Sequence, residues 1–175
     1  MNKKAISGVI TAVIMIAIVM SMISVLWVVV NNIVEDKLTE AGSCFNTFEK
    51  VKINNFYTCY NTPDESSGDP DELHLSIDVS EIDIEKLLVS VSGSGESKSF
   101  TLTKDGINEN FLRNYKNGIY GELITLPEKN SGKTYIINTG FFPISIQIAP
   151  IINGKQCEVS DSLYQIDNCK SLVSP

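Results

Sequence analysis

The sequence predicts an α+β protein, in which a long N-terminal apolar α-helix is followed by an antiparallel β-sandwich-like head domain. Three observations support this prediction. Residues 5–34 contain no charged side chain and are mostly Ile, Val, Met, Leu or Ala. After residue 42, short segments alternate apolar and polar side chains, and Gly- and Pro-containing turns separate them. All four cysteines also follow the apolar segment, as expected if that part of the chain is exported.

The apolar segment is long enough to cross a lipid bilayer. At about 1.5 Å per residue, a helix over residues 5–34 would be about 45 Å long, whereas the hydrocarbon core of a bilayer is about 30 Å thick. A cleaved secretory signal has an apolar region of only about 7–15 residues and a small-residue cleavage site after it. Residues 27–32 offer no such site. We therefore expect the segment to stay in the mature protein.

The charges that flank the apolar segment predict its orientation. Lys3 and Lys4 precede it, whereas Glu35, Asp36 and Glu40 follow it closely. Because positively charged flanks stay on the cytoplasmic side of a membrane, the N-terminus is expected inside and the large domain outside.

Small residues recur along the apolar segment at helical spacings of three and four. On a helix they form faces that another helix can approach closely. The alternative is a generic membrane anchor, in which small residues are also common. The candidate packing residues are Gly8, Ala12, Ala17, Ser21 and Ser24.

The extreme N-terminus carries a more specific pattern. Lys3, Lys4 and Ala5 directly precede the apolar run that starts Ile6-Ser7-Gly8-Val9-Ile10. This start resembles that of archaeal type IV pilins and archaellins, which carry a class III signal sequence. In that family a short basic leader ends in Gly or Ala, and a prepilin peptidase cuts before the apolar helix. The resemblance implies that Lys3, Lys4 and Ala5 belong to the leader and that Ile6 becomes the new N-terminus.

Two further positions favour the archaeal branch of the family. Residues 7–10 are similar to the S-P-V-I run common in archaeal sequences, with Gly8 where proline often stands. Bacterial pilins usually carry a glutamate at the fifth mature position, which here is Ile10. The resemblance covers residues 3 to about 40. It implies a leader at 1–5, a transmembrane or filament-core helix at 6–42 and an extracellular β-rich head at 43–175.

The remainder of the chain has the pattern of short strands. The helix is expected to stop at Gly42, where the apolar period changes from helical to alternating. A hairpin loop is expected at 92–97, and the stretch 106–118 has the character of a short helix or a long loop. Strands at this spacing predict an antiparallel sandwich or barrel. The expected strands are residues 73–80, 87–91, 100–102, 122–126, 134–138 and 144–148.

The cysteines Cys44, Cys59, Cys157 and Cys169 predict two disulfides. Their number is even and no C-x-x-C motif occurs, so a zinc site is not expected. Four cysteines allow three pairings. We favour Cys44–Cys59 with Cys157–Cys169, because each bond closes a short local loop. Four reduced, buried thiols in a cytosolic domain are the alternative.

Few residues of the head carry chemistry. The single histidine, His74, falls on the outward side of an alternating strand and is expected to face solvent. Residues 64–72 hold five carboxylates, which could bind Ca²⁺ but lack the EF-hand spacing and are better explained as a solvated loop. Phe141, Phe142 and Tyr57 mark either an adhesive patch or packing. We expect no enzyme, no cofactor and no metal.

Charge and pattern together lead to a functional expectation. The net charge is −7, and residues 35–175 alone sum to −9 because Lys3 and Lys4 are the only charges before Glu35. Such a surface repels nucleic acid. The expected protein is a subunit of a type IV pilus-like surface filament. Its partners would be copies of itself, a prepilin peptidase and assembly machinery, and the membrane before assembly. The alternatives are a single-span anchored binding domain that does not polymerise, and a minor pilin or pseudopilin.

Overall fold

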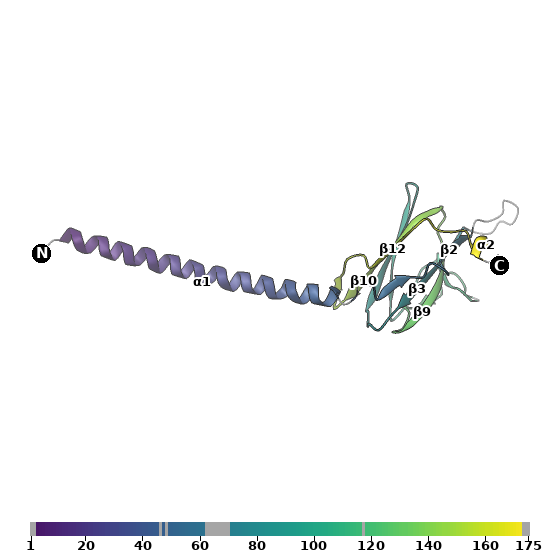
Figure 1. Cartoon of the computed structure of the whole chain (residues 1–175), viewed down its shortest axis with the longest axis horizontal. Helices are drawn as coiled ribbons and strands as arrows, with labels where there is room; N and C mark the ends of the chain where they lie inside the picture. The colour runs from purple at the N-terminus through teal and green to yellow at the C-terminus, as the bar shows by residue number, and fades with distance from the viewer. Residues whose placement is uncertain (1–2, 46, 48, 62–70, 117, 173–175) are drawn as a thin grey trace. The chain divides into compact units, whose positions relative to one another are not determined.

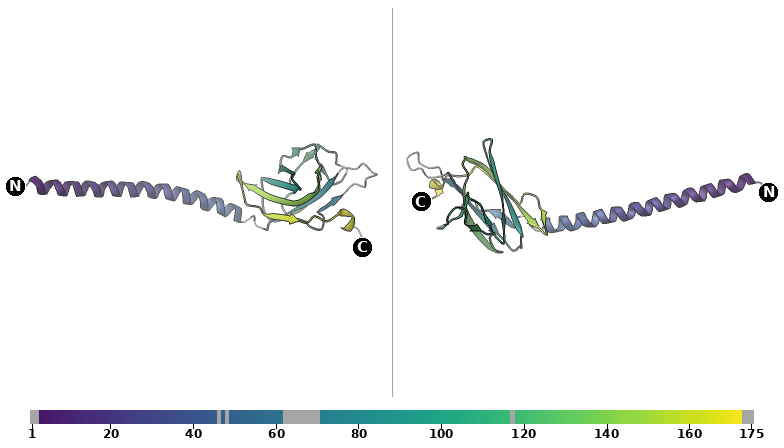
Figure 2. Two further views of the ribbon diagram at one scale, coloured as in Figure 1. Left: turned by 90° about the horizontal axis from the view of Figure 1, so that it is seen from above. Right: turned by 180° about the vertical axis from the view of Figure 1, so that it is seen from behind.

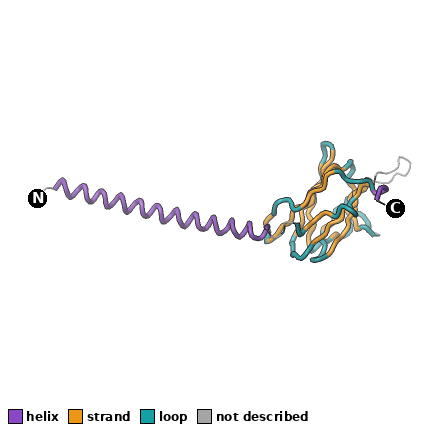
Figure 3. Tube along the Cα trace, viewed as in Figure 1, coloured by secondary structure: helices purple, strands orange, loops and turns teal. Residues whose placement is uncertain are grey.

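A computed structural model describes residues 3–45, 47, 49–61, 71–116 and 118–172. The chain divides into two compact units, residues 1–42 and 43–175. Helix α1 (Lys3–Phe45) accounts for the first unit and the start of the second, and the remaining elements form the head (Figures 1 and 3). This order of one long apolar helix followed by antiparallel sheets confirms the predicted α+β class.

Helix α1 is one uninterrupted element of 43 residues, about 64 Å long at about 1.5 Å per residue. Within it, Ile10–Glu35 is long and apolar enough to cross a membrane, with a mean hydropathy of 2.9. The helix continues to Phe45, past the predicted stop at Gly42. It ends where the backbone N–H and the hydroxyl of Thr47 both donate to the carbonyl of Cys44, at 3.0 and 2.6 Å. These bonds satisfy a terminal carbonyl that the helix itself leaves unpaired.

Two five-stranded antiparallel sheets form the layers of the head (Figure 2). In the first sheet the order is β1-β3-β9-β7, with β2 also paired to β3. In the second the order is β11-β10-β4-β5, with β12 also paired to β10. The first sheet consists of β1 (Val51–Ile53), β2 (Cys59–Asn61), β3 (Glu72–Val79), β7 (Leu112–Asn114) and β9 (Ser131–Asn138). The second consists of β4 (Lys86–Gly93), β5 (Ser97–Thr103), β10 (Pro143–Ile152), β11 (Lys155–Gln156) and β12 (Asp161–Tyr164).

Three short elements complete the head: a two-stranded sheet of β6 (Ile107–Asn108) with β8 (Leu123–Ile124), and helix α2 (Cys169–Leu172). The structure thereby resolves the stretch 106–118, where it places β6 and β7 instead of a helix. Strands of two or three residues are too short to show the alternation of apolar and polar side chains by which strands are predicted from sequence.

Both sheets contribute to a single apolar core. Alternate residues of β3 are fully buried, as are the matching residues of β4 and β10 in the opposite layer. This is the arrangement that period-2 alternation predicts when one face of each sheet is covered. Core residues with no exposed surface include Leu73, Leu75 and Ile77 of the first sheet and Leu87, Val89, Ile146 and Ile148 of the second.

The predicted hairpin is confirmed, with a shorter loop. Strands β4 and β5 pair from Lys86↔Thr103 to Ser92↔Ser97, so residues 94–96 alone form the tip. Gly95 has φ of 85°, in the left-handed region that favours glycine. The N–H of Gly93 donates to the carbonyl of Glu96 at 2.9 Å and closes the turn.

The four cysteines form two disulfides, as predicted, but the favoured pairing is wrong. Cys44 bonds to Cys157, and Cys59 bonds to Cys169. The predicted pairing favoured short loops, on the assumption that cysteines close in sequence are also close in space. In the head, however, the first and last segments lie side by side, so each bond joins residues more than 100 positions apart.

Candidate functional site

The first candidate is the apolar surface of α1. Between Ile10 and Val34 its large apolar side chains are 45–66% exposed, and none is buried. A helix that is apolar on all sides and exposed along its length has to be covered by lipid or by other helices. The helix therefore has the surface of an element that functions in a membrane or in a bundle.

Small residues interrupt this surface on two sides of the helix. At about 100° per residue, Gly8 and Ala12 lie on one side, whereas Ala17, Ser21 and Ser24 lie on roughly the opposite side. Sequence inspection found these residues but not their division into two patches. Each patch is a place where a neighbouring helix backbone can approach closely.

The polar groups in the second patch are already satisfied within the helix. The Ser21 hydroxyl donates to the carbonyl of Ile18 at 2.7 Å, and the Ser24 hydroxyl donates to the carbonyl of Met20 at 2.9 Å. Because both hydroxyls have acceptors, this patch can enter lipid or a dry helix bundle without the cost of an unpaired polar group.

The leader residues lie at the very start of α1. Lys3, Lys4, Ala5 and Ile6 are all helical, in the first turn and the start of the second. The cut after Ala5 and the resulting Ile6 terminus stay predictions.

The second candidate is a clamp made by the two ends of the head, residues 44–60 and 157–169. The two disulfides join these segments near both of their ends. Between them, the N–H of Ile53 donates to Asp161 Oδ2 at 2.8 Å, and the N–H of Tyr60 donates to the carbonyl of Asp167 at 2.8 Å. The clamp fixes the C-terminal segment to the strands that directly follow the helix.

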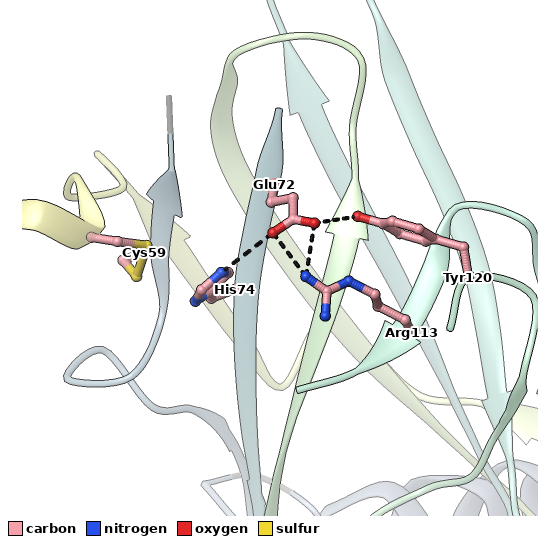
Figure 4. Close-up of polar contacts among 6 residues, drawn as sticks. Cys59, Glu72, His74, Arg113 and Tyr120 are labelled. Carbon is pink, nitrogen blue, oxygen red and sulfur yellow. Dashed lines mark hydrogen bonds and ion pairs between the residues drawn. A yellow bond between two sulfur atoms is a disulfide. The ribbon is translucent and has the colours of Figure 1, made fainter. Parts of the chain in front are cut away.

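The third candidate is a polar cluster on the first sheet, centred on Glu72 of β3 (Figure 4). One guanidinium nitrogen of Arg113 donates to Oε1 and Oε2 of Glu72, at 2.8 and 3.0 Å. The Tyr120 hydroxyl donates to Oε1 at 2.7 Å. The side chains of Glu72 and Arg113 are only 14% and 22% exposed, so solvent screens this ion pair weakly.

The cluster changes the acidity of its members. Burial alone would raise the pKa of Glu72, but hydrogen bonds from Arg113 and Tyr120 outweigh it and hold the pKa below its usual value. Burial and the hydrogen bond to Glu72 raise the pKa of Tyr120 to about 12. Glu72 is therefore a stable carboxylate that holds two neighbouring side chains in place. Arg113, the only arginine of the sequence, had no role in the sequence interpretation.

His74 is not the solvent-facing residue that alternation predicted. It lies on the non-core face of β3, but its side chain is only 22% exposed. Tyr115 packs edge-on against its ring at 5.6 Å between centroids, and Nε2 lies 3.9 Å from Glu72 Oε2. Burial lowers the pKa of His74, which favours the neutral imidazole. Loop residues far along the chain provide this cover, so strand alternation alone could not reveal it.

A cavity of about 600 Å³ is lined by the end of β3, the start of β9 and the loop that contains Leu126. Lys133 reaches into its wall and donates to the carbonyl and hydroxyl oxygens of Thr125, at 3.3 and 2.9 Å. Burial lowers the pKa of Lys133. Lys104 pairs with Asp83 on the rim. Two of the lysines on its wall are therefore already engaged by oxygen atoms of the protein.

The residues proposed for adhesion separate into two groups. Tyr57 and Phe142 are exposed, and Phe142 also packs edge-on against Tyr60 at 5.0 Å between centroids. Phe141 is instead half-buried against the core. Of the acidic stretch, residues 64–70 lie outside the described part of the chain, and Glu72 is committed to Arg113.

Comparison with known proteins found no family model, no curated protein and no solved structure that matches this chain. Its function must therefore be inferred from its own residues and geometry. An exposed apolar N-terminal helix followed by antiparallel sheets is consistent with a pilin-like architecture. The helix and the two disulfides also indicate a membrane or extracellular location.

Proposed function

We propose that this protein is a structural subunit of a type IV pilus-like cell-surface filament. A prepilin peptidase would remove residues 1–5, and the helix would then leave the bilayer to pack beside copies of itself. The observation that carries the proposal is the predominantly apolar, exposed surface of α1 over Ile10–Glu35. Moving this surface from lipid to neighbouring helices keeps it in apolar surroundings, so no large transfer cost opposes assembly.

The arrangement of small residues supports polymerisation over simple anchoring. A monomeric membrane anchor needs no surface for packing against another helix, and a symmetric dimer needs one such surface. The patches at Gly8–Ala12 and at Ala17–Ser24 face in roughly opposite directions, so each helix can pack against neighbours on two sides. When one surface binds a different surface on the next copy and the rotation does not close, the product is an open helical filament.

The head has the properties expected of a filament coat. Its acidic charge keeps a crowded surface solvated through self-repulsion. Its clamp ties the C-terminal segment to the strands that directly follow the helix in sequence, through which a filament under tension would pull on the head. Both properties suit a structural role, and we expect no catalytic activity and no nucleic acid binding.

The main rival is an anchored extracellular domain that never polymerises. It shares the helix and the disulfides, so the distinction lies in processing and in release from the membrane. The test is the N-terminal residue of the native protein, determined by mass spectrometry in a sheared fraction and in membranes. Ile6 in the sheared fraction supports a filament subunit, and Ile6 confined to membranes supports a minor pilin. An N-terminus at Met1 or Asn2, confined to membranes, contradicts the proposal.

A further inference from the structure

The only histidine of the sequence lies beside one of the two disulfides. Ligand atoms of Cys59, His74 and Cys169 all lie within 4.8 Å of one another. Figure 4 shows the His74 ring between Cys59 and the carboxylate of Glu72. The site is sheltered, because Cys59 is buried and both His74 and Cys169 are half-buried. The disulfide Cys44–Cys157 has no such neighbour, since no second histidine exists.

We propose that reduction of the Cys59–Cys169 disulfide converts this position into a binding site for a thiophilic divalent cation, with Zn²⁺ as the natural occupant. Two cysteine thiolates and one imidazole are a common zinc ligand set, and a water molecule can complete the tetrahedron. The same residues thus form a covalent bond in the oxidised chain and a metal site in the reduced chain.

The geometry is compatible with zinc. Tetrahedral zinc with bonds of about 2.3 Å to sulfur and about 2.0–2.1 Å to nitrogen holds its ligand atoms about 3.5–3.8 Å apart. The three atoms are already within 4.8 Å of one another, so small side-chain rotations are sufficient. No backbone segment has to be brought in from elsewhere, because β2, β3 and α2 already position the ligands.

Glu72 lies beside the histidine and can accept a hydrogen bond from it when the site is occupied. Its Oε2 lies 3.9 Å from Nε2 of His74, which is beyond hydrogen-bond distance, so a small rotation must bring Nε2 to the carboxylate and leave Nδ1 for the metal. A carboxylate beside the second imidazole nitrogen is the usual support of zinc-bound histidines, since it fixes the tautomer and the ring orientation. Arg113 and Tyr120 hold Glu72 in turn. The polar cluster on β3 is therefore an outer layer of the proposed site.

The conversion requires a reductant, which we take to be a dithiol. One equivalent of dithiol gives up two electrons and two protons, closes to its own disulfide and leaves Cys59 and Cys169 as thiols. Binding of Zn²⁺ then releases two protons as both thiols become thiolates. Because zinc binds only the reduced form, it favours reduction of this disulfide over the other.

The test uses full-length chain in detergent, anaerobically, with Co²⁺ as the spectroscopic probe and Zn²⁺ as competitor. The double variant Cys44→Ser/Cys157→Ser keeps only the proposed ligands. The matched control Cys59→Ser/Cys169→Ser keeps two thiols without a histidine beside them. Both are reduced with a phosphine, freed of reductant and titrated. In the first variant we expect a thiolate-to-cobalt charge-transfer band that saturates at one equivalent and disappears on addition of Zn²⁺.

His74→Phe in the first variant keeps a ring against Tyr115 but removes the nitrogen ligand. We expect it to weaken Co²⁺ binding at least about tenfold, and Glu72→Gln to weaken it about tenfold. Circular dichroism monitors the strands of each reduced protein. If reduction alone unfolds the head, Zn²⁺ must restore the strand signal. The proposal is overturned by absence of the band, by equal affinity in the control, by wild-type affinity in His74→Phe, or by failure of Zn²⁺ to refold an unfolded reduced head.

Discussion

Cys44, in the last turn of α1, is bonded to Cys157, which lies 113 residues further along the chain. The bond closes almost the entire head into one loop, and Cys59–Cys169 closes a second loop of nearly the same extent. Together they hold the first and last segments of the head against each other. In a filament subunit, this arrangement keeps the head folded even when force is applied through the helix.

Peptide mapping can verify the pairing directly. Trypsin leaves Cys157 and Cys169 in one peptide, because no lysine or arginine lies between them. Further cleavage after Glu158 separates them. We expect non-reducing mass spectrometry to find the Cys157 fragment linked to the one with Cys44, and the Cys169 fragment linked to the one with Cys59. A fragment with Cys44 linked to Cys59 would contradict the structure.

Removal of the disulfides should destabilise the head in a characteristic pattern. When one disulfide is already present, the other closes a loop of only about 27 residues in the unfolded chain. By restricting the unfolded chain, this second bond is expected to add about 3.5 kcal/mol to the free energy of unfolding. We expect about this loss of unfolding free energy in either double serine variant, and about 8 kcal/mol without both bonds. Denaturant titration of full-length chain in detergent measures these values. If the losses of unfolding free energy in the two double serine variants differed by several kcal/mol, the two bonds would not close equivalent loops.

The ion pair between Glu72 and Arg113 predicts a substitution effect at neutral pH. Arg113→Met leaves a largely buried carboxylate with Tyr120 as its remaining strong donor, which should cost about 1–3 kcal/mol of unfolding free energy. Lys116→Met, at an exposed position in the turn that follows β7, is the control and should change stability by less than about 0.5 kcal/mol. Equal stability of both variants would mean that the pair contributes nothing.

The same pair predicts a pH dependence. Hydrogen bonds from Arg113 and Tyr120 hold the folded-state pKa of Glu72 below the ordinary value of a glutamate, so the unfolded state binds the proton more readily. The contribution of Glu72 is therefore fully present above about pH 4.5 and is lost as the pH falls through the folded pKa. We expect wild-type stability to fall more steeply than that of Glu72→Gln in this acidic range. Burial of neutral His74 also removes stability on acidification, and the Glu72 charge raises the pKa of His74, so both proteins are compared in a His74→Phe background in which this contribution is absent. Parallel pH profiles would refute this assignment.

The two small-residue patches should both be required for assembly. Gly8→Leu with Ala12→Leu, and separately Ala17→Leu with Ser21→Leu, place large side chains where a neighbouring helix backbone is expected. Each pair should abolish or strongly reduce filaments in the sheared fraction while membrane levels of the protein stay unchanged. Met20→Leu, an exposed large residue outside both patches, should have no effect. Normal filament yield from either patch variant would show that its patch is not a contact.

Most of the fold follows from local patterns in the sequence. The charge-free run 5–34 predicts a long helix because a helix satisfies every backbone group within a single segment in an apolar environment. Alternation in β3, β4 and β10 predicts half-buried strands because each has one face on the core. Short strands such as β1, β2, β11 and β12 were missed, since two to four residues do not establish a period.

The features that were mispredicted depend on contacts between distant segments. The disulfide pairing follows from the neighbouring positions of residues 44–60 and 157–169, which no local pattern encodes. The cover over His74 comes from Tyr115, and the partner of Glu72 comes from β7. The sequence interpretation noted His74 as the single histidine and Glu72 as part of an acidic stretch, but it did not single out Arg113.

Cryo-electron microscopy of material sheared from cells tests the central claim most directly. The account predicts filaments with this chain as a repeating subunit, a core in which α1 packs against copies of itself through both small-residue patches, and a surface formed by the disulfide-bonded heads. If the sheared material contains no filament built from this chain, and the protein remains entirely in the membrane fraction, the central claim is contradicted, and the protein is an anchored surface domain or a minor pilin.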